Sequence, residues 1–543
     1  MVRTFLLLIA ITLTGCEQAE DPATERPNFL LIVTDDMGYT DLGAFGGADI
    51  PTPNLDRLAM GGVRFNNFHV APSCAPTRSM LMSGTGNHEA GLGSQLVRPE
   101  YADEWGYERF IPKRIATLPE VLRADGYHTY MTGKWHLASG DPTAASLAGN
   151  RGFERSFSMI LGGEGHIETV ATEPIYSADG KRLVESPQDF HSTNLFIDKM
   201  LGFIKSNVDD GKPFFAWLAP TAPHWPLQPH PDWLDRFAGD YDAGFDVLCA
   251  QRLAGAIEAE VMPANALSTR CDKTELAWEE LDEPKRAMYR RAMELYAAMA
   301  AHLDYELQRI VDYLEATGKL DNTYIIFMND NGAQGGPFES RPPDDQRDNS
   351  LENLGRKGSW INVGAGWADA MSAGFRGNKA VQYEGGIRVP AFIWHQDAET
   401  RGKVDNQLLT VMDIMPTVLE LAGTAAPGAM FDGRKVLPIR GKSFASALNI
   451  GAPPAHPADE DIALASAGRN VMFRGPWKLV RELEKGWELF NLDDDPSETT
   501  DLATQMPELT QDMVNAFAGF AAERNYLDRV SAPVAPVSSG PDP

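Results

Sequence analysis

The sequence predicts an α/β protein in which a central sheet is covered by helices and followed by a smaller C-terminal α+β domain. A helical segment followed by a strand-like segment recurs four times between residues 54 and 331. The strands end in polar or charged residues, which is typical of a sheet whose functional site lies at the carboxyl ends of its strands. After residue 424 the composition shifts to short strands and one last helix, which indicates the second domain.

The first strand is expected at residues 27–33. The run PNFLLIV is apolar and rich in branched residues, and it is followed closely by Asp35 and Asp36. Such a run is typical of a buried strand, and here it leaves two carboxylates at the strand's carboxyl end. A short helix is expected at residues 54–60, where a glycine pair ends it, and VRFNNFHV then indicates another strand.

Three further pairs of helix and strand deliver polar side chains in the same way. Thr117 and Glu120 have the spacing of a capping box at the start of the first of these helices. The other two helices are expected at residues 194–205 and 284–318. The strands are YHTYMTGKW, PFFAWLAP and TYIIFMNDNG, and the side chains at their ends are Lys134, His136, His224, Asp330 and Asn331.

The last part of the chain has a different pattern. A helix at residues 412–423 precedes the short strand-like runs NVMFRGPWKLV and WELFNL, and a final helix is expected at residues 508–524. We therefore expect a main domain at residues 27–424, a C-terminal α+β subdomain at residues 425–529, and a disordered tail rich in Pro and Ser at residues 530–543.

The overall charge restricts the possible partners. The chain has 543 residues, is 43% hydrophobic and carries a formal net charge of −28. Such a charge argues against nucleic acid as a partner, because an acidic surface repels a phosphate backbone. Any site for an anionic ligand must therefore be a local pocket of positive charge.

The N-terminus has the pattern of an export signal. Arg3 precedes an apolar run at residues 5–13, which is too short to cross a bilayer that needs roughly 20 residues. The run ends in LTGC, which resembles the lipobox of bacterial lipoproteins and makes Cys16 the expected lipid anchor. The alternative is a plain signal peptide with an incidental cysteine.

These observations predict where the protein is found. We expect a lipoprotein signal peptide at residues 1–16, a polar linker at residues 17–26, and an exported bacterial lipoprotein on the periplasmic side or the surface of the outer membrane. Contact with the membrane would occur only through the lipid at Cys16.

Four cysteines occur in the chain: Cys16, Cys74, Cys249 and Cys271. If Cys16 is lipidated and Cys74 has a chemical role, Cys249 and Cys271 are left over in an oxidising compartment. A disulfide between these two is plausible, and two free buried thiols are the alternative.

The residues at the strand ends form two chemically distinct groups. Asp35, Asp36, Asp330 and Asn331 offer hard oxygen ligands, which suit Ca²⁺ or Mg²⁺ better than zinc. The second group is cationic or basic and consists of Lys134, His136, His224 and Lys379. Fixed cations beside a divalent metal stabilise a tetrahedral oxyanion as charge develops in a transition state.

The stretch from Cys74 to Arg78, CAPTR, matches the C-x-P-x-R signature of type I sulfatases. The motifs TDDMG, GKWHL, APHWP, NDNG and YEGGIRVP occur in the same order as in that family. The chain therefore resembles type I sulfatases, and is most similar to the bacterial arylsulfatases. The resemblance implies the alkaline phosphatase-like fold, with a large mixed sheet between layers of helices, and places the sulfatase domain at residues 27–424.

The resemblance also implies a mechanism. A formylglycine-generating enzyme would read the signature and oxidise Cys74 to formylglycine, whose hydrate attacks the sulfur of a sulfate ester and then ejects sulfate. Asp35, Asp36, Asp330, Asn331 and residue 74 would bind Ca²⁺, with Mg²⁺ as a possible substitute. In the same way Arg78, Lys134 and His136 would orient the hydrate, with His136 as the base for its collapse. His224 and Lys379 would face the sulfate and the leaving oxygen, with His224 as general acid.

Three other functions fit parts of the sequence. A phosphonate or phosphate ester hydrolase could use the same aldehyde, an unmodified Cys74 could serve as a thiolate nucleophile, and a non-catalytic lipoprotein could bind sulfated glycans. The leaving group stays open among aryl, alkyl and carbohydrate sulfates. We expect an insertion near the site at residues 240–283 and a long pocket-shaping loop at residues 335–373.

Overall fold

The structure is a computed structural model. It describes residues 25–526, with gaps at residues 98, 102–103, 142, 172–174, 267–270, 272–276, 341–346, 467 and 484. The predicted signal peptide with Cys16, most of the predicted linker and the predicted tail lie outside these residues. Within the described part of the chain, no helix is both long enough and apolar enough to span a membrane.

The main domain is built on a mixed sheet, which in the described residues has ten strands in the order β11-β2-β10-β9-β1-β8-β4-β5-β6-β7. The strands are β1 (Asn28–Thr34), β2 (Val63–Phe65), β4 (His128–Lys134), β5 (Arg155–Met159), β6 (Tyr176–Ala178), β7 (Lys181–Arg182), β8 (Phe214–Ala219), β9 (Thr323–Asn329), β10 (Ala391–Trp394) and β11 (Lys403–Asp405). The central strands β9, β1, β8 and β4 are parallel neighbours, whereas β10 runs antiparallel to β9 and β2. The predicted mixed sheet is therefore confirmed.

The burial of strand β1 on both faces explains why its sequence is a continuous apolar run. Phe29, Leu31 and Val33 belong to one hydrophobic core, whereas Leu30 and Ile32 belong to another. Because neighbouring side chains of a strand point to opposite faces, a strand buried on both faces needs apolar residues at every position.

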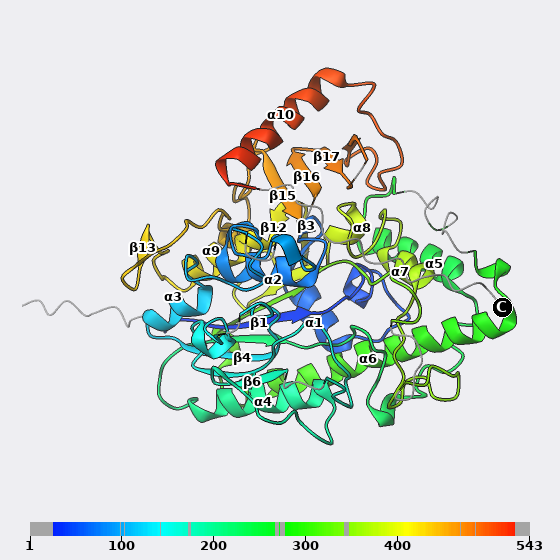
Figure 1. Cartoon of the computed structure of the whole chain (residues 1–543), viewed down its shortest axis with the longest axis horizontal. Helices are drawn as coiled ribbons and strands as arrows, with labels where there is room; N and C mark the ends of the chain where they lie inside the picture. The colour runs from blue at the N-terminus through cyan, green and yellow to red at the C-terminus, as the bar shows by residue number, and fades with distance from the viewer. Residues whose placement is uncertain are drawn as a thin grey trace, which may run out of the picture.

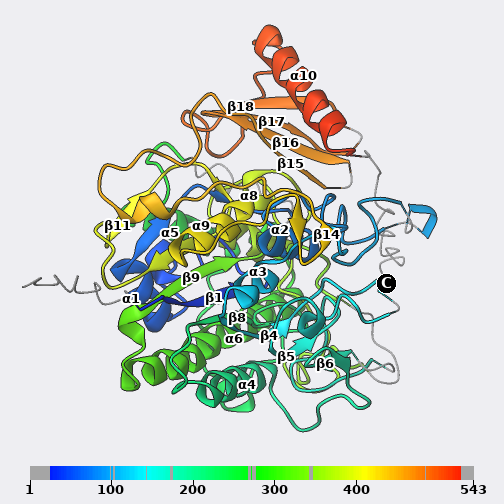
Figure 2. The same ribbon diagram turned by 90° about the vertical axis from the view of Figure 1, so that its left-hand side faces the viewer.

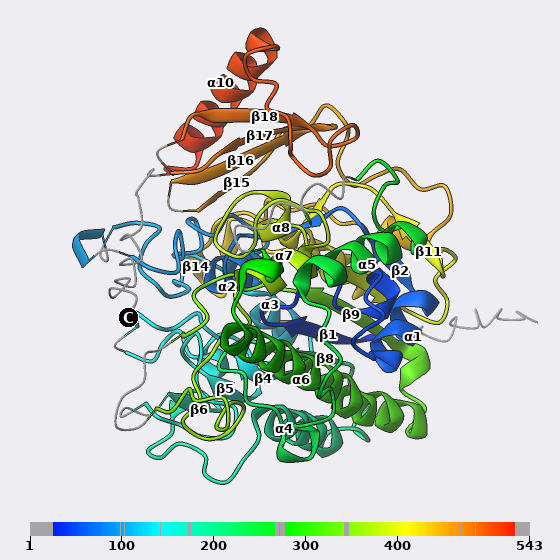
Figure 3. The ribbon, with the colours of Figure 1, turned by 90° about the vertical axis from the view of Figure 1, so that its right-hand side faces the viewer.

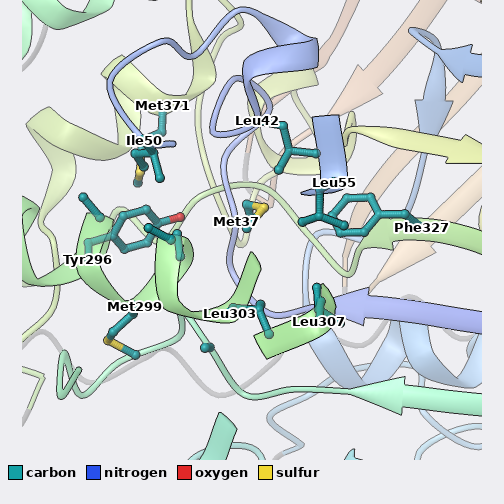
Figure 4. Close-up of a cluster of buried hydrophobic side chains, with 14 of the residues drawn as sticks. Met37, Leu42, Ile50, Leu55, Tyr296, Met299, Leu303, Leu307, Phe327 and Met371 are labelled. Atoms are coloured by element: carbon teal, nitrogen blue, oxygen red, sulfur yellow. The ribbon is translucent and has the colours of Figure 1, made fainter. Parts of the chain in front are cut away.

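Helices cover both faces of the sheet (Figure 1). On one face lie α1 (Pro53–Gly61), α4 (Ser192–Ser206), α5 (Phe245–Glu258), α6 (Glu283–Ala316) and α7 (Ala365–Ser372). On the other lie α2 (Cys74–Ser83), α3 (Leu118–Ala124) and α9 (Ile414–Leu421). Figure 4 shows part of the first core, in which Tyr296, Leu303 and Leu307 of α6 cluster with Phe327 of β9. The sheet is thus sandwiched between two helical layers, as predicted.

Several details of the sequence prediction can be compared with the structure. The capping box of α3 is present: Glu120 N donates to Thr117 Oγ1 and Thr117 N donates to Glu120 Oε2.

The Cys249–Cys271 disulfide is formed, which confirms the pairing that the sequence left open. The predicted loop at residues 335–373 was wrong in part, because its end forms the buried helix α7.

The strand predicted from VRFNNFHV is divided into two. Its first half is β2 in the main sheet, and its second half is β3 (Phe68–His69), which pairs with β12 (Leu409–Thr410) in a separate two-stranded sheet. The chain leaves the main sheet between these halves at Asn66 and Asn67, which are half-buried and belong to neither strand.

The C-terminal part forms an antiparallel sheet with a helix on one face (Figures 2 and 3). In the described residues the sheet contains β15 (Ile462–Ser466), β16 (Arg469–Arg474), β17 (Trp477–Arg481) and β18 (Trp487–Asn491), and α10 (Pro507–Glu523) covers it. The opposite face contributes Ile462, Leu464, Val471 and Phe473 to a core of the main domain. The two parts therefore share a hydrophobic interface.

A buried ion cluster crosses this interface. Lys478 of β17 lies 2.7 Å from Glu384 Oε1 and 2.8 Å from Glu498 Oε1, and all three side chains are 0% exposed. Glu384 begins the short helix α8 (Glu384–Ile387) of the main domain, where His69 and Arg388 also contact it. The C-terminal sheet is thus attached to α8 by charge as well as by apolar contacts.

Lys478→Met tests this attachment. Removing the cation leaves two buried carboxylates without their shared partner, which typically costs about 3–5 kcal/mol. We expect a lower urea midpoint for unfolding, whereas Lys435→Met, at an exposed strand position, should leave the midpoint unchanged. Equal midpoints for the two variants would contradict this assignment.

Candidate active site

The predicted site residues lie together at the carboxyl ends of the central parallel strands. Asp35 and Asp36 follow β1, Asp330 and Asn331 follow β9, and Lys134 ends β4. His136 follows β4, His224 follows β8, Cys74 and Arg78 lie on α2, and Lys379 lies in the loop before α8. Because parallel strands end at one edge of the sheet, segments far apart in the sequence meet there.

The backbone at the strand ends is shaped to aim these side chains inward. Asp36 and His136 have φ angles of 64° and 57°, in the left-handed region that non-glycine residues rarely adopt. Asn329, which the sequence analysis missed, joins β1 to β9: its amide accepts from Met37 N and donates to Met37 O. This side chain fixes the turn that carries both aspartates.

The spacing of CAPTR is explained by the start of α2. Cys74 is the first residue of this helix and Arg78 follows four residues later, so the two side chains share one face. Pro76 stands in the first turn, where a missing N–H costs no helical hydrogen bond. The helix N-terminus favours negative charge at residue 74. All residues of α2, from Cys74 to Ser83, are buried.

Each buried carboxylate of the site has its own cation. Lys134 Nζ donates to Asp35 Oδ2 at 2.6 Å, and Lys379 Nζ donates to Asp36 Oδ1 at 2.6 Å. Arg78 Nε donates to Asp330 Oδ2 at 2.8 Å, and a second guanidinium nitrogen lies 2.7 Å from the same oxygen. The Cys74 Sγ lies 3.6 Å from Asp35 Oδ1.

Burial and these neighbours shift the pKa values. Burial alone would raise the pKa of Asp36, but Lys379, His224 and Lys134 outweigh it and hold that pKa below its usual range. Burial, followed by the charges of Asp330 and Asp35, raises the pKa of the Cys74 thiol to about 12. The unmodified thiol therefore keeps its proton at neutral pH.

Both histidines of the site are neutral at neutral pH. Burial and the charges of Lys134 and Arg78 lower the pKa of His136 well below its usual value. Burial also lowers the pKa of His224 to about 3, with Lys134 adding to the shift and Asp36 opposing it. His224 Nδ1 lies 2.6 Å from the Trp225 carbonyl and must donate to it, so Nε2 carries a lone pair.

The oxygen ligands fit a divalent cation. His224 Nε2 lies 3.4 Å from Asp36 Oδ2. Among the described residues, no donor hydrogen-bonds to Asp36 Oδ2 or Asn331 Oδ1, although both are buried. Ligand atoms of Asp35, Asp36, Cys74 and His224 lie within 4.8 Å of one another. Asp330, a predicted ligand, is not part of this group, and Arg78 holds its Oδ2. The carboxylate oxygens of Asp35 and Asp36 are ligands of the kind that Ca²⁺ and Mg²⁺ prefer.

Comparison with known proteins decides the family. The Sulfatase family model matches residues 27–424. The chain belongs to the sulfatase family. An arylsulfatase of Klebsiella aerogenes is 36% identical over 441 residues, which cover 78% of this chain and 92% of that relative. An uncharacterized sulfatase of Schizosaccharomyces pombe is 38% identical over 539 residues, which cover 94% of this chain and 96% of the relative. This sulfatase is thus a sulfuric ester hydrolase.

Solved structures show the same fold. The crystal structure of Ps i-CgsB in complex with k-i-k-neocarrahexaose has a TM-score of 0.67 and 23% identity, and covers 94% of this chain and 95% of that one. BT4656 in complex with D-glucosamine-2-N,6-O-disulfate has a TM-score of 0.62 and 21% identity, and covers 93% of this sulfatase and 99% of BT4656.

Sequence analysis missed a glycine pair that packs on both histidines. A Cβ added to Gly162 would lie 2.6 Å from His136 Cε1, and a Cβ added to Gly163 would lie 2.9 Å from His224 Cε1. Both distances are shorter than real Cβ contacts, so residues 162 and 163 must be glycine for the segment to lie against the two rings. The signal in the sequence is the run GGEGH, which follows β5 and is rich in glycine.

Gly163→Ala is expected to displace the His224 ring. A shift of this kind commonly lowers turnover by up to about 10²-fold, because the reacting groups lose their alignment. The measurement is kcat for an aryl sulfate, with thermal unfolding to show that the fold persists. The control is Gly202→Ala in α4, where a methyl group would meet no described atom within 4 Å. Unchanged kcat in Gly163→Ala would show that the ring tolerates the contact.

Proposed function

We propose that this sulfatase hydrolyses sulfate esters of phenols or sugars with residue 74, oxidised to formylglycine, as the nucleophile. The observation that carries the proposal is the position of Cys74 at the N-terminus of α2, one helical turn from Arg78 and beside Asp35. The arylsulfatase relative supports an aryl sulfate, and the sugar disulfate bound by BT4656 supports a carbohydrate sulfate. The modifying partner would be a formylglycine-generating enzyme.

Calcium is the proposed metal, with magnesium as a possible substitute. Asp35, Asp36, Asp330, Asn331 and residue 74 would hold it. When bound, a hard divalent cation supplies Lewis acidity for the nucleophilic oxygen and for a sulfate oxygen. The charges support this choice. Three carboxylates are balanced by Arg78, Lys134 and Lys379, so a divalent cation leaves a surplus of two positive charges for an anionic ester and an ionised nucleophile.

The protein side chains would position charge and move protons. Arg78 and Lys134 lie beside residue 74 and would stabilise negative charge there. Neutral His136 can accept a proton from residue 74 when sulfate is expelled. Lys379 would bind the sulfate. His224 would protonate the leaving oxygen, because an anionic ester bound beside its ring raises the low pKa and places a proton on Nε2.

The alternatives receive less support. A thiolate mechanism would leave the carboxylate ligands beside Cys74 without a role. A non-catalytic glycan-binding protein needs no such site, whereas the buried pairs of carboxylates and cations support a catalytic one. A phosphate ester hydrolase is disfavoured by the family match.

We also propose that the sulfatase is an exported lipoprotein of the outer membrane, anchored through Cys16. The support is the apolar run that ends in LTGC and the polar linker that follows it. The Cys249–Cys271 disulfide agrees with an oxidising compartment.

Substitution of Cys74 tests the nucleophile. Cys74→Ala should abolish turnover. Cys74→Ser keeps one hydroxyl that can attack sulfur but lacks the second oxygen needed to expel sulfate, so it should accumulate a sulfated enzyme. Mass spectrometry of the peptide at residue 74 checks both the aldehyde in the wild type and the trapped sulfate in the variant. Ser83→Ala in the same helix is the control. A fully active protein whose residue 74 is unmodified cysteine would overturn the proposal.

Removal of calcium tests the metal. We expect treatment with EGTA to abolish turnover and to lower the thermal midpoint, because the buried carboxylates lose a ligand that binds only the folded state. Added Ca²⁺ should restore both, and Zn²⁺ should not. Elemental analysis that finds zinc and neither calcium nor magnesium in active protein would exclude the oxygen-ligand site as described.

A further inference from the structure

His166 is a buried histidine outside the predicted site, yet it contacts His224, the proposed general acid. It follows the glycine pair Gly162 and Gly163, and only 1% of it is exposed. Its Nε2 lies 2.8 Å from the backbone carbonyl oxygen of His224. Since a carbonyl can only accept, Nε2 must carry the hydrogen and donate it.

The other ring nitrogen fixes this tautomer. His166 Nδ1 lies 2.7 Å from the hydroxyl of Ser192 at the start of α4. Because Nε2 holds the hydrogen, the neutral ring can only accept at Nδ1, so Ser192 donates. The backbone of His166 is also held, because its N–H donates to Gln228 Oε1 and its carbonyl accepts from Ser192 N. The ring is therefore fixed in one orientation.

His224 needs such support because it stands in a turn and not in a helix or strand. Its N–H donates to the Thr221 carbonyl at 2.9 Å, and its carbonyl accepts from His166. Its ring donates from Nδ1 to the Trp225 carbonyl, and Gly163 packs against the ring edge. The segment at residues 162–166 thus touches both the ring and the backbone of His224.

We propose that His166 is a positioning residue, which holds the His224 peptide so that Nε2 faces the leaving oxygen. This inference rests on the role proposed above for His224. His166 bonds the backbone of His224 and not its ring, so it acts through orientation and takes no proton from the substrate. Loss of the hydrogen bond leaves a buried carbonyl unpaired and lets the turn move.

The leaving-group dependence of the rate separates positioning from a general loss of stability. A good leaving group such as 4-nitrophenol needs little protonation, whereas phenol needs more. We expect His166→Leu to lower kcat/KM for phenyl sulfate roughly 10-fold more than for 4-nitrophenyl sulfate, in the same direction as His224→Ala. His166→Gln, whose amide can still donate to the carbonyl, should restore most of the difference.

A double-mutant cycle gives the second measurement. If His166 acts through His224, adding His166→Leu to His224→Ala should change the leaving-group dependence no further. His395→Leu is the matched control, because His395 is a buried histidine stacked on Tyr324, near the opposite end of β9. If His166→Leu does not fold, Ser192→Ala should show a smaller effect in the same direction, because it removes the nearer partner of His166 Nδ1 and leaves only Thr221 Oγ1 at 3.4 Å.

Three results would overturn the inference. The first is an equal loss of rate for the two substrates, the second is additivity with His224→Ala, and the third is a glutamine variant as impaired as the leucine variant. If His224→Ala lowers kcat/KM equally for phenyl sulfate and 4-nitrophenyl sulfate, the proposed role of His224 is refuted, and the inference is refuted with it. The single variant of His224 therefore tells the two failures apart.

Discussion

The structure depends on a balance of charge among buried side chains. Asp35, Asp36 and Asp330 are buried together, and such a group would repel itself strongly in a medium of low dielectric constant. Direct contacts with Lys134, Lys379 and Arg78 compensate for each carboxylate. Every cation comes from a different element, so the site exists only when strand ends, helix and loop are all in place.

The C-terminal sheet contributes to this balance from outside the site. The loop that carries Lys379 leads into α8, and acidic side chains of the C-terminal part bind it: Glu482 accepts from Gln382 N, Glu498 accepts from Glu384 N, and Glu488 contacts Arg376. Lys478 in turn neutralises Glu384 and Glu498. The second domain thus helps to set the position of a cation in the first.

Sequence patterns predicted the features that local chemistry determines. The apolar run of β1, the capping box of α3 and the polar ends of β4, β8 and β9 follow from side-chain periodicity and hydrogen-bonding capacity. Asn329, the Gly162 and Gly163 pair and the burial of Lys478 could not be predicted in this way. Their environment is created by segments far away in the chain, and a lysine in WKLVR has the pattern of a solvated strand residue until its two glutamates are placed beside it.

The complete burial of α2 has a consequence for the order of events in biosynthesis. The residues from Cys74 to Ser83 are all enclosed by other parts of the chain, so no second protein can reach the CAPTR stretch after the main domain has closed. If residue 74 is oxidised as proposed, the oxidation must precede folding. Chains that fold first would be trapped as stable, correctly shaped and inactive molecules, and later supply of the modifying enzyme could not recover them.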